Sequence, residues 1–120
     1  MRLFETLISL GVVAVFCVLA WAAKASAEAL LFGGLGLAAL GFAYGIPTAI
    51  VYHWLLHRSL ARHDRLPPRW WLSPTSHHDL VPPAERPRIL LWAGIGGSGF
   101  LVIVLGIVLT SLGLWRARGV

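Results

Sequence analysis

ILLWAGIGGSGFLVIVLGIVLTSLGLW, residues 89–115, is the stretch of sequence that decides the fold. It contains no charged side chain over its 27 residues. Because the hydrocarbon core of a bilayer is ~30 Å thick, about 20 apolar residues in a helix are enough to cross it. Trp115 ends the stretch and Arg116 follows at once, and both residue types are common where a helix leaves a membrane. The stretch therefore predicts a membrane-spanning helix.

Two more runs, residues 6–23 and 29–56, are also free of Asp, Glu, Lys and Arg. A helix over 29–56 would be ~42 Å long, so we expect its last turns to emerge into the headgroup layer. Pro47 removes a backbone donor and is predicted to kink this helix. The sequence thus predicts an all-α integral membrane protein, a single domain over 1–120 with three transmembrane helices.

The composition excludes an ordinary soluble domain. Hydrophobic residues make up 58% of the chain and charged residues 12%, against about 25% charged residues in soluble proteins. The net charge of +5 would suggest a nucleic-acid partner in a soluble chain. Here most arginines lie between two apolar runs, where membrane proteins keep their cytoplasmic charge. We therefore expect no nucleic-acid partner.

The first run has a second interpretation. Ala25-Ser26-Ala27 follows it and has the pattern of a signal-peptide cleavage site. The run is longer than the roughly 7–15 apolar residues usual in such a signal. We therefore expect it to be retained as a span.

Basic residues are unevenly divided between the two sides of the predicted membrane. With three spans, one side holds Arg2 and six arginines of the loop 58–88, seven in all, and the other holds three, Lys24, Arg116 and Arg118. Positive residues favour the cytoplasmic side. We expect a bacterial inner (cytoplasmic) membrane protein with the N-terminus and the loop in the cytoplasm and the C-terminus outside.

The cytoplasmic loop 58–88 holds six of the seven prolines, so no long regular element is expected there. Its arginines can reach lipid phosphates while its indole rings lie in the interface. The candidate lipid-headgroup residues are Arg58, Arg62, Arg69, Trp70 and Trp71.

Small residues recur at regular intervals in the second and third runs. Small residues let two helices approach closely in a membrane, within one chain or between chains. The candidate helix-packing residues are Gly41, Gly45 and Ala49 at every fourth position, and Gly99, Gly106 and Gly113 at every seventh.

Histidines suggest a second kind of site. Imidazoles four residues apart share a helix face and can bind zinc, iron or copper. The candidate metal ligands are His53, His57, His77 and His78. The HxxxH and HH elements resemble fragments of the histidine boxes of membrane fatty-acid desaturases and hydroxylases. Those families use more histidines in longer chains, so their activity is not carried over. We favour the alternative in which these histidines lie at the membrane interface and the protein has no cofactor. The other interpretation is that they bind a transition metal.

The predicted spans contain no Asp, Glu, Lys or Arg, the charged groups that ion and proton pathways normally use. We therefore expect a small accessory subunit of a larger membrane assembly and favour a role that is not enzymatic. Its partners would be lipids and other membrane subunits, or further copies of itself. The alternative function is a metal-binding membrane protein with a histidine cluster at its cytoplasmic surface.

Overall fold

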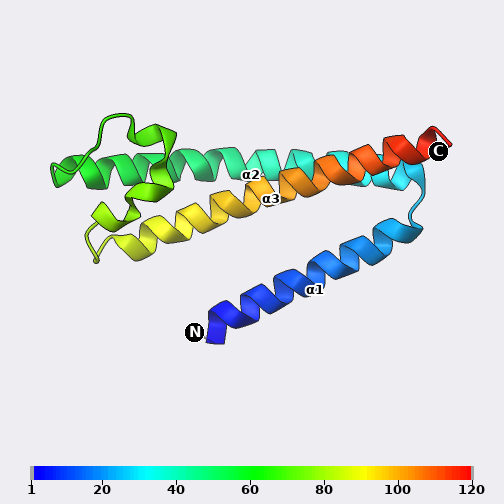
Figure 1. Cartoon of the computed structure of the whole chain (residues 1–120), viewed down its shortest axis with the longest axis horizontal. Helices are drawn as coiled ribbons and strands as arrows, with labels where there is room; N and C mark the ends of the chain where they lie inside the picture. The colour runs from blue at the N-terminus through cyan, green and yellow to red at the C-terminus, as the bar shows by residue number, and fades with distance from the viewer. Residues whose placement is uncertain (1, 120) are drawn as a thin grey trace. The chain divides into compact units, whose positions relative to one another are not determined.

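A computed structural model of the chain describes residues 2–119, apart from the side chains of Arg2 and Phe4. Figure 1 shows the elements in chain order, which are α1 (Arg2–Lys24), α2 (Ala27–Arg62), the 3-10 helices η1 (Trp70–Leu72) and η2 (Pro74–Leu80), and α3 (Arg86–Ala117). The part of the chain that the structure describes contains no strand.

The three long helices are each long and apolar enough to cross a membrane. The predicted all-α class and its three apolar helices are therefore confirmed. The predicted ranges 6–23, 29–56 and 89–115 lie within α1, α2 and α3 respectively, and every helix extends beyond them. α2 continues through Pro47 as one helix.

The break between α1 and α2 is made by Ser26. Its hydroxyl accepts a hydrogen bond from the backbone N–H of Ala29 at 3.1 Å. Its carbonyl accepts the first bond of the helix from Leu30, at 3.0 Å. Ser26 is therefore the N-cap of α2, which is the position where serine is favoured.

The end of α2 is a Schellman turn. The N–H of Arg65 donates to the carbonyl of Leu60 at 2.9 Å, and that of Asp64 donates to Ala61 at 3.3 Å. Asp64 has a φ of 52°, the left-handed conformation that this turn requires and that aspartate tolerates better than most residues. The turn ends the helix just before Pro67 and Pro68.

The described chain divides into two compact units. The first consists of Met1–Leu35 with Gly106–Val120, and the second of Gly36–Leu105. Each unit contains parts of both α2 and α3, and these parts lie side by side (Figure 1).

In the first unit, α2 and α3 are antiparallel and touch at their backbones. A Cβ atom placed on Gly34 would lie 2.5 Å from the backbone N of Thr110 and 2.6 Å from the carbonyl O of Gly106. One placed on Gly113 would lie 2.7 Å from the backbone N of Leu31. Contacts this short leave room only for glycine at these two positions.

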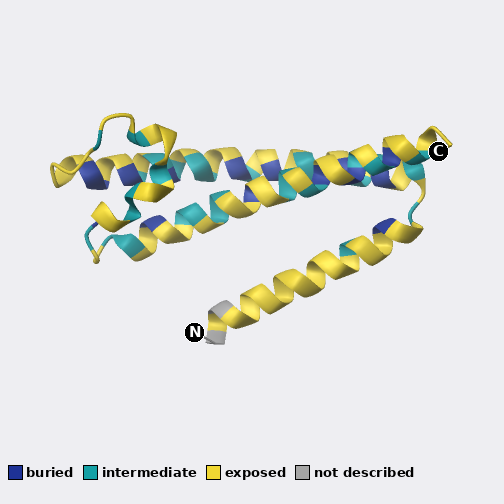
Figure 2. Cartoon of the chain, viewed as in Figure 1, coloured by how far each residue is buried: buried dark blue, intermediate teal, exposed yellow. Residues whose placement is uncertain are grey.

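The C-terminal end of α1 is held by an arginine of α3. The guanidinium of Arg116 donates to the carbonyls of Ala22 at 2.9 Å, Ala25 at 2.5 Å and Ala23 at 3.2 Å. The last carbonyls of a helix have no partner within the helix, so Arg116 satisfies groups that α1 leaves open. Figure 2 shows the rest of α1 exposed over nearly all of its length.

In the second unit, α2 and α3 also touch at their backbones. A Cβ atom on Gly41 would lie 2.9 Å from both the backbone N of Ile103 and the carbonyl O of Gly99. One on Gly99 would lie 2.6 Å from the Cα of Gly45. The hydroxyls of Tyr44 and Ser98 add a hydrogen bond of 3.1 Å between the two helices.

Candidate functional site

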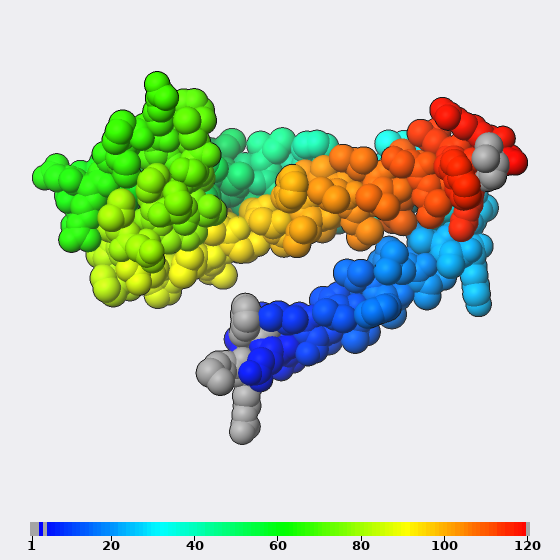
Figure 3. All heavy atoms as spheres, viewed as in Figure 1, coloured from blue at the N-terminus to red at the C-terminus, as the bar shows by residue number. Residues whose placement is uncertain are grey.

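The loop between α2 and α3 folds against the helix ends of the second unit, and Figure 3 shows it in green gathered over them. Val81 is 1% exposed and joins an apolar cluster formed with the two helices, whose other buried members are Tyr52, Leu56, Leu60 and Ile89. Arg86 donates to the carbonyl of Val81 at 3.0 Å. Arg65 donates to that of Leu80 at 3.1 Å. The burial of Val81 and the hydrogen bonds from Arg65 and Arg86 thus help to hold the loop in place.

Tyr52 and His78 join η2 to α2. The Tyr52 hydroxyl and His78 Nε2 share a hydrogen bond of 2.6 Å. Burial lowers the pKa of the His78 imidazole below its ordinary value of 6.5, and the Asp79 carboxylate acts in the opposite direction. Near neutral pH His78 is therefore an uncharged partner for the tyrosine.

The other predicted metal ligands lie among different partners. His53 Nδ1 is 2.7 Å from the carbonyl of Ala49. The rings of His53 and His57 lie 6.1 Å and 5.4 Å from the ring of Trp70. His77 is half-buried in η2. Over residues 2–119 no group of three or more His, Cys, Asp or Glu side chains lies where it could hold one metal ion. The metal site stays a prediction.

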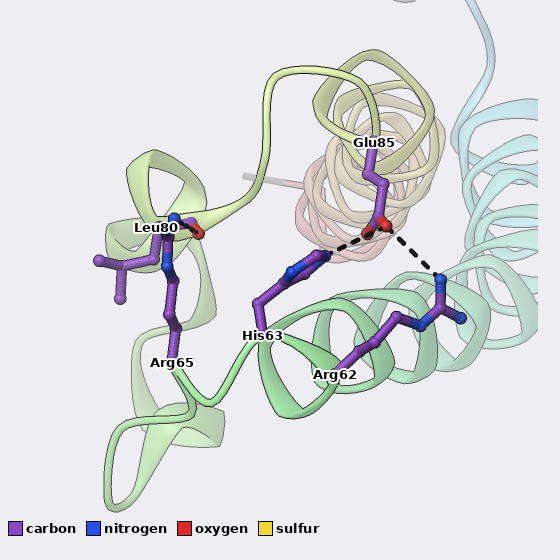
Figure 4. Close-up of polar contacts among 5 residues, drawn as sticks. All are labelled: Arg62, His63, Arg65, Leu80 and Glu85. Carbon is purple, nitrogen blue, oxygen red and sulfur yellow. Dashed lines mark hydrogen bonds and ion pairs between the residues drawn. The ribbon is translucent and has the colours of Figure 1, made fainter.

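A charged cluster is centred on Glu85, immediately before α3 (Figure 4). Its Oε1 lies 3.6 Å from Nη1 of Arg62 and 3.5 Å from Nε2 of His63. The pKa of the Glu85 carboxyl is held below its ordinary 4.5, first by the adjacent Ser59 hydroxyl and then by His63 and Arg62. Ser59 Oγ nevertheless makes no hydrogen bond of regular geometry to any described residue. We conclude that the hydroxyl is near Glu85 but not fully engaged by it.

This cluster borders a groove of about 330 Å³ in the second unit. One wall comes from the last turns of α2 and the other from the start of α3 and the residues before it. The polar and charged side chains that line the groove are Arg58, Ser59, Arg62, Glu85 and Arg88. The groove therefore combines three guanidinium groups with one carboxylate.

The predicted lipid-headgroup residues take up different positions. Arg58 lies over the ring of Trp54, 5.2 Å from its centre, and lines the groove with Arg62. Arg69 is exposed and has a left-handed φ of 56°. Trp70 packs against the apolar cluster, whereas Trp71 is 61% exposed. The five residues are thus spread over several surfaces of the second unit.

The predicted packing residues lie between α2 and α3. Gly41, Gly45, Gly99, Gly106 and Gly113 are all buried. Ala49 is half-buried, and its Cα would lie 3.7 Å from a Cβ atom on Gly96. Within each unit, these residues lie at the contact between α2 and α3 of the same chain.

Sequence reasoning did not find Ser59, Glu85 or Arg88 as parts of a groove. The positions of Arg58, Ser59 and Arg62 place all three near one face of α2, since residues three and four apart are neighbours on a helix. The spacing of these three residues could therefore have indicated a shared polar face at the end of α2. The approach of Glu85 and Arg88 depends on how the loop folds, which no local pattern shows.

These features define an all-helical chain with three helices that are long and apolar enough to cross a membrane. Comparison with protein-family models, with curated proteins and with solved structures found no match.

Proposed function

We propose that this chain is a small accessory subunit of a larger membrane assembly, and that its first helix is the surface that meets the partner. In this proposal α1, α2 and α3 cross the bacterial inner membrane. The N-terminus and the loop 58–88 lie in the cytoplasm and the C-terminus lies outside, as the uneven distribution of arginine indicates.

The observation that carries the proposal is the burial of α1. Only 6% of the most apolar stretch of α1 is buried, against 22% of the corresponding stretch of α2 and 17% of that of α3. The glycines at the contact between α2 and α3 are already occupied within the chain; these are Gly34, Gly41, Gly45, Gly99 and Gly113. Within its own unit, α1 is held at its last turn by Arg116, and almost all of its earlier residues are exposed.

Gly11 gives α1 a point of close approach. It lies in the middle of the helix, and no described atom outside its own helix comes within 4 Å of a Cβ placed there. Glycine in a helix interior costs about 0.8–1.0 kcal/mol relative to alanine in water, while in a membrane it permits a second helix to pack closely. A partner helix at Gly11 would explain why glycine is present.

The chemistry of the apolar runs agrees with a structural role. Residues 6–23, 29–56 and 89–115 contain no Asp, Glu, Lys or Arg, whereas ion and proton pathways normally use such groups. A subunit that supports a partner needs an apolar surface on its membrane-spanning helices, and the helices of this chain have one.

Native mass spectrometry of the protein, extracted gently from its own membrane, tests the proposal. We expect a complex of defined stoichiometry that contains this chain and a second membrane protein. Gly11→Leu should remove the chain from that complex, because the added side chain occupies the space a partner would need. A chain that leaves the membrane only as a lone monomer would refute the subunit role.

Val12→Leu is the matched control. Val12 is 48% exposed and next to Gly11, but it lies about 100° around the helix from it. We expect the complex to survive this change. If Gly11→Leu also leaves the complex intact, the partner does not bind at the Gly11 face of α1.

A further inference from the structure

The groove between the end of α2 and the start of α3 has a chemistry that the subunit role does not use. Three guanidinium groups line it, and only one of them has a carboxylate partner among the described residues. Arg62 is that one, and its Nη1 is 3.6 Å from Glu85, beyond a normal hydrogen bond. Arg58 and Arg88 have no such partner within residues 2–119. The groove is therefore positive and suited to an anion.

Ser59 supplies an independent indication of a ligand. This residue lines the groove and is 3% exposed, yet its Oγ atom makes no regular hydrogen bond. Buried hydroxyl groups in proteins are normally paired. The hydroxyl lies beside the Glu85 carboxylate without a regular hydrogen bond to it, so it is able to donate to an oxygen of a bound anion.

The kind of anion follows from the arginines. A guanidinium presents paired N–H donors in a plane, which match the oxygens of a phosphate group. Three arginines with one hydroxyl donor fit a phosphate better than a single carboxylate, because a carboxylate offers only two oxygens.

The groove also has an apolar side, formed in part by Leu55 and Ile89. Leu55 is half-buried and Ile89 is 3% exposed. Both continue into the apolar runs of their helices, so a bound molecule would meet charge at one end and hydrocarbon at the other. A free phosphate would gain nothing from that apolar side, whereas a phospholipid would.

We propose that this groove binds the phosphate of an anionic membrane phospholipid. Arg58, Arg88 and Ser59 contact the phosphate oxygens, while Glu85, which also lines the groove, shares Arg62 with the ligand. The first part of one acyl chain lies along Leu55 and Ile89. This inference rests on the proposed membrane location of the helices but not on any partner protein.

Native mass spectrometry of the purified full chain in a neutral detergent tests it. The chain is titrated with phosphatidylglycerol or with phosphatidylcholine of the same acyl chains. We expect one phosphatidylglycerol per chain, held about tenfold more tightly than phosphatidylcholine, whose ammonium group the arginines repel. Ser59→Ala should weaken the binding of phosphatidylglycerol by roughly three- to tenfold through the loss of one donor. Equal retention of the two lipids, or an unchanged affinity in Ser59→Ala, would overturn the assignment.

A pair of double variants separates a built site from general surface charge. Arg58→Gln with Arg88→Gln removes two charges from the groove, and Lys24→Gln with Arg118→Gln removes two charges outside it. Only the first pair should abolish the preference for phosphatidylglycerol, with the helical circular dichroism of both unchanged. Equal losses in the two pairs would mean diffuse electrostatic attraction and would overturn the proposal.

Inorganic phosphate distinguishes the two sources of the same group. If the ligand is a lipid, phosphate at lipid-matched concentrations does not displace phosphatidylglycerol. Displacement would mean that the groove takes a soluble phosphate and would overturn the lipid assignment. Lipid binding is measured on the isolated chain, so a negative result does not contradict the subunit proposal. Likewise, the absence of a native complex would not contradict lipid binding in the groove.

Discussion

α1 and the α2–α3 pair have similar compositions but very different surroundings. All three helices are long and apolar enough to cross a membrane, yet α2 and α3 press backbone to backbone while most of α1 is exposed. The difference lies in the glycines. Several glycines of α2 and α3 meet across the contact, such as Gly45 opposite Gly99, whereas no described atom outside α1 lies within 4 Å of a Cβ atom at Gly11. Apolar composition therefore sets where a helix can reside, and the register of small residues sets what it packs against.

The largest expected effect comes from filling the contact between α2 and α3. Gly99→Ala places a Cβ atom 2.6 Å from the Cα of Gly45, and because that neighbour is backbone it cannot turn aside. We expect a loss of about 1–3 kcal/mol in the free energy of unfolding, as for other overpacked sites. Denaturation of the chain in mixed micelles, followed by circular dichroism, measures it.

Gly97→Ala is the control in the same helix. No described atom outside the helix lies within 4 Å of a Cβ atom at Gly97, so the change should leave stability equal or slightly higher. If Gly97→Ala and Gly99→Ala have the same effect, helix propensity and not close packing explains the result.

A smaller effect is expected at the end of α1. Arg116→Gln removes most of the bonds to the carbonyls of Ala22, Ala23 and Ala25 and should cost roughly 0.5–1.5 kcal/mol locally. Hydrogen–deuterium exchange should then be faster over residues 22–25 and unchanged near Gly99. Arg118→Gln is the control, because Arg118 is exposed and its side chain makes no hydrogen bond or ion pair with any described residue. Unchanged exchange in Arg116→Gln would mean that α1 does not depend on this anchor.

A pH effect is expected at the loop. The pKa of His78 is below 6.5 in the folded chain, so between that folded value and 6.5 the unfolded chain binds more protons. The stability that His78 contributes is therefore complete above pH 6.5 and is lost as the pH falls through the folded value. Exchange over residues 74–81 should rise as the pH is lowered in this range, after correction for the intrinsic rate. His78→Gln should remove that dependence, and its persistence would point to another group.

The smallest effect is expected at Glu85. Its ion pairs with Arg62 and His63 are long and partly exposed, and such pairs contribute little. Glu85→Gln should leave the melting temperature nearly unchanged while it tightens phosphatidylglycerol binding, because a competing negative charge is removed from the groove. Weaker lipid binding in this variant would show that Glu85 organises the groove instead of competing in it.

The features that were predicted best from the sequence are those that depend on neighbouring residues along the chain. Uninterrupted apolar runs predicted the three long helices, and Pro67 and Pro68 agree with the end of α2 at Arg62. The spacing of Gly99, Gly106 and Gly113 predicted a packing face but not its occupant, since one chain or two can use it equally.

The less predictable features depend on distant contacts. Arg116 was interpreted as an anchor at the membrane surface, and it also closes the end of α1, more than 90 residues away in sequence. The groove needs the loop to bring Glu85 beside Ser59, and that approach follows from the burial of Val81. Neither arrangement has a periodic signal in the sequence.

Site-specific photo-crosslinking in living cells tests most directly whether α1 is the surface for a partner. A crosslinking amino acid replaces Val15, one turn from Gly11 on the same face, and separately Phe100 on α3. Both positions are exposed, at 50% and 65%. The account predicts a discrete protein adduct from position 15 that Gly11→Leu abolishes. Adducts with lipid alone from position 15, in the presence of a protein adduct from position 100, would contradict it.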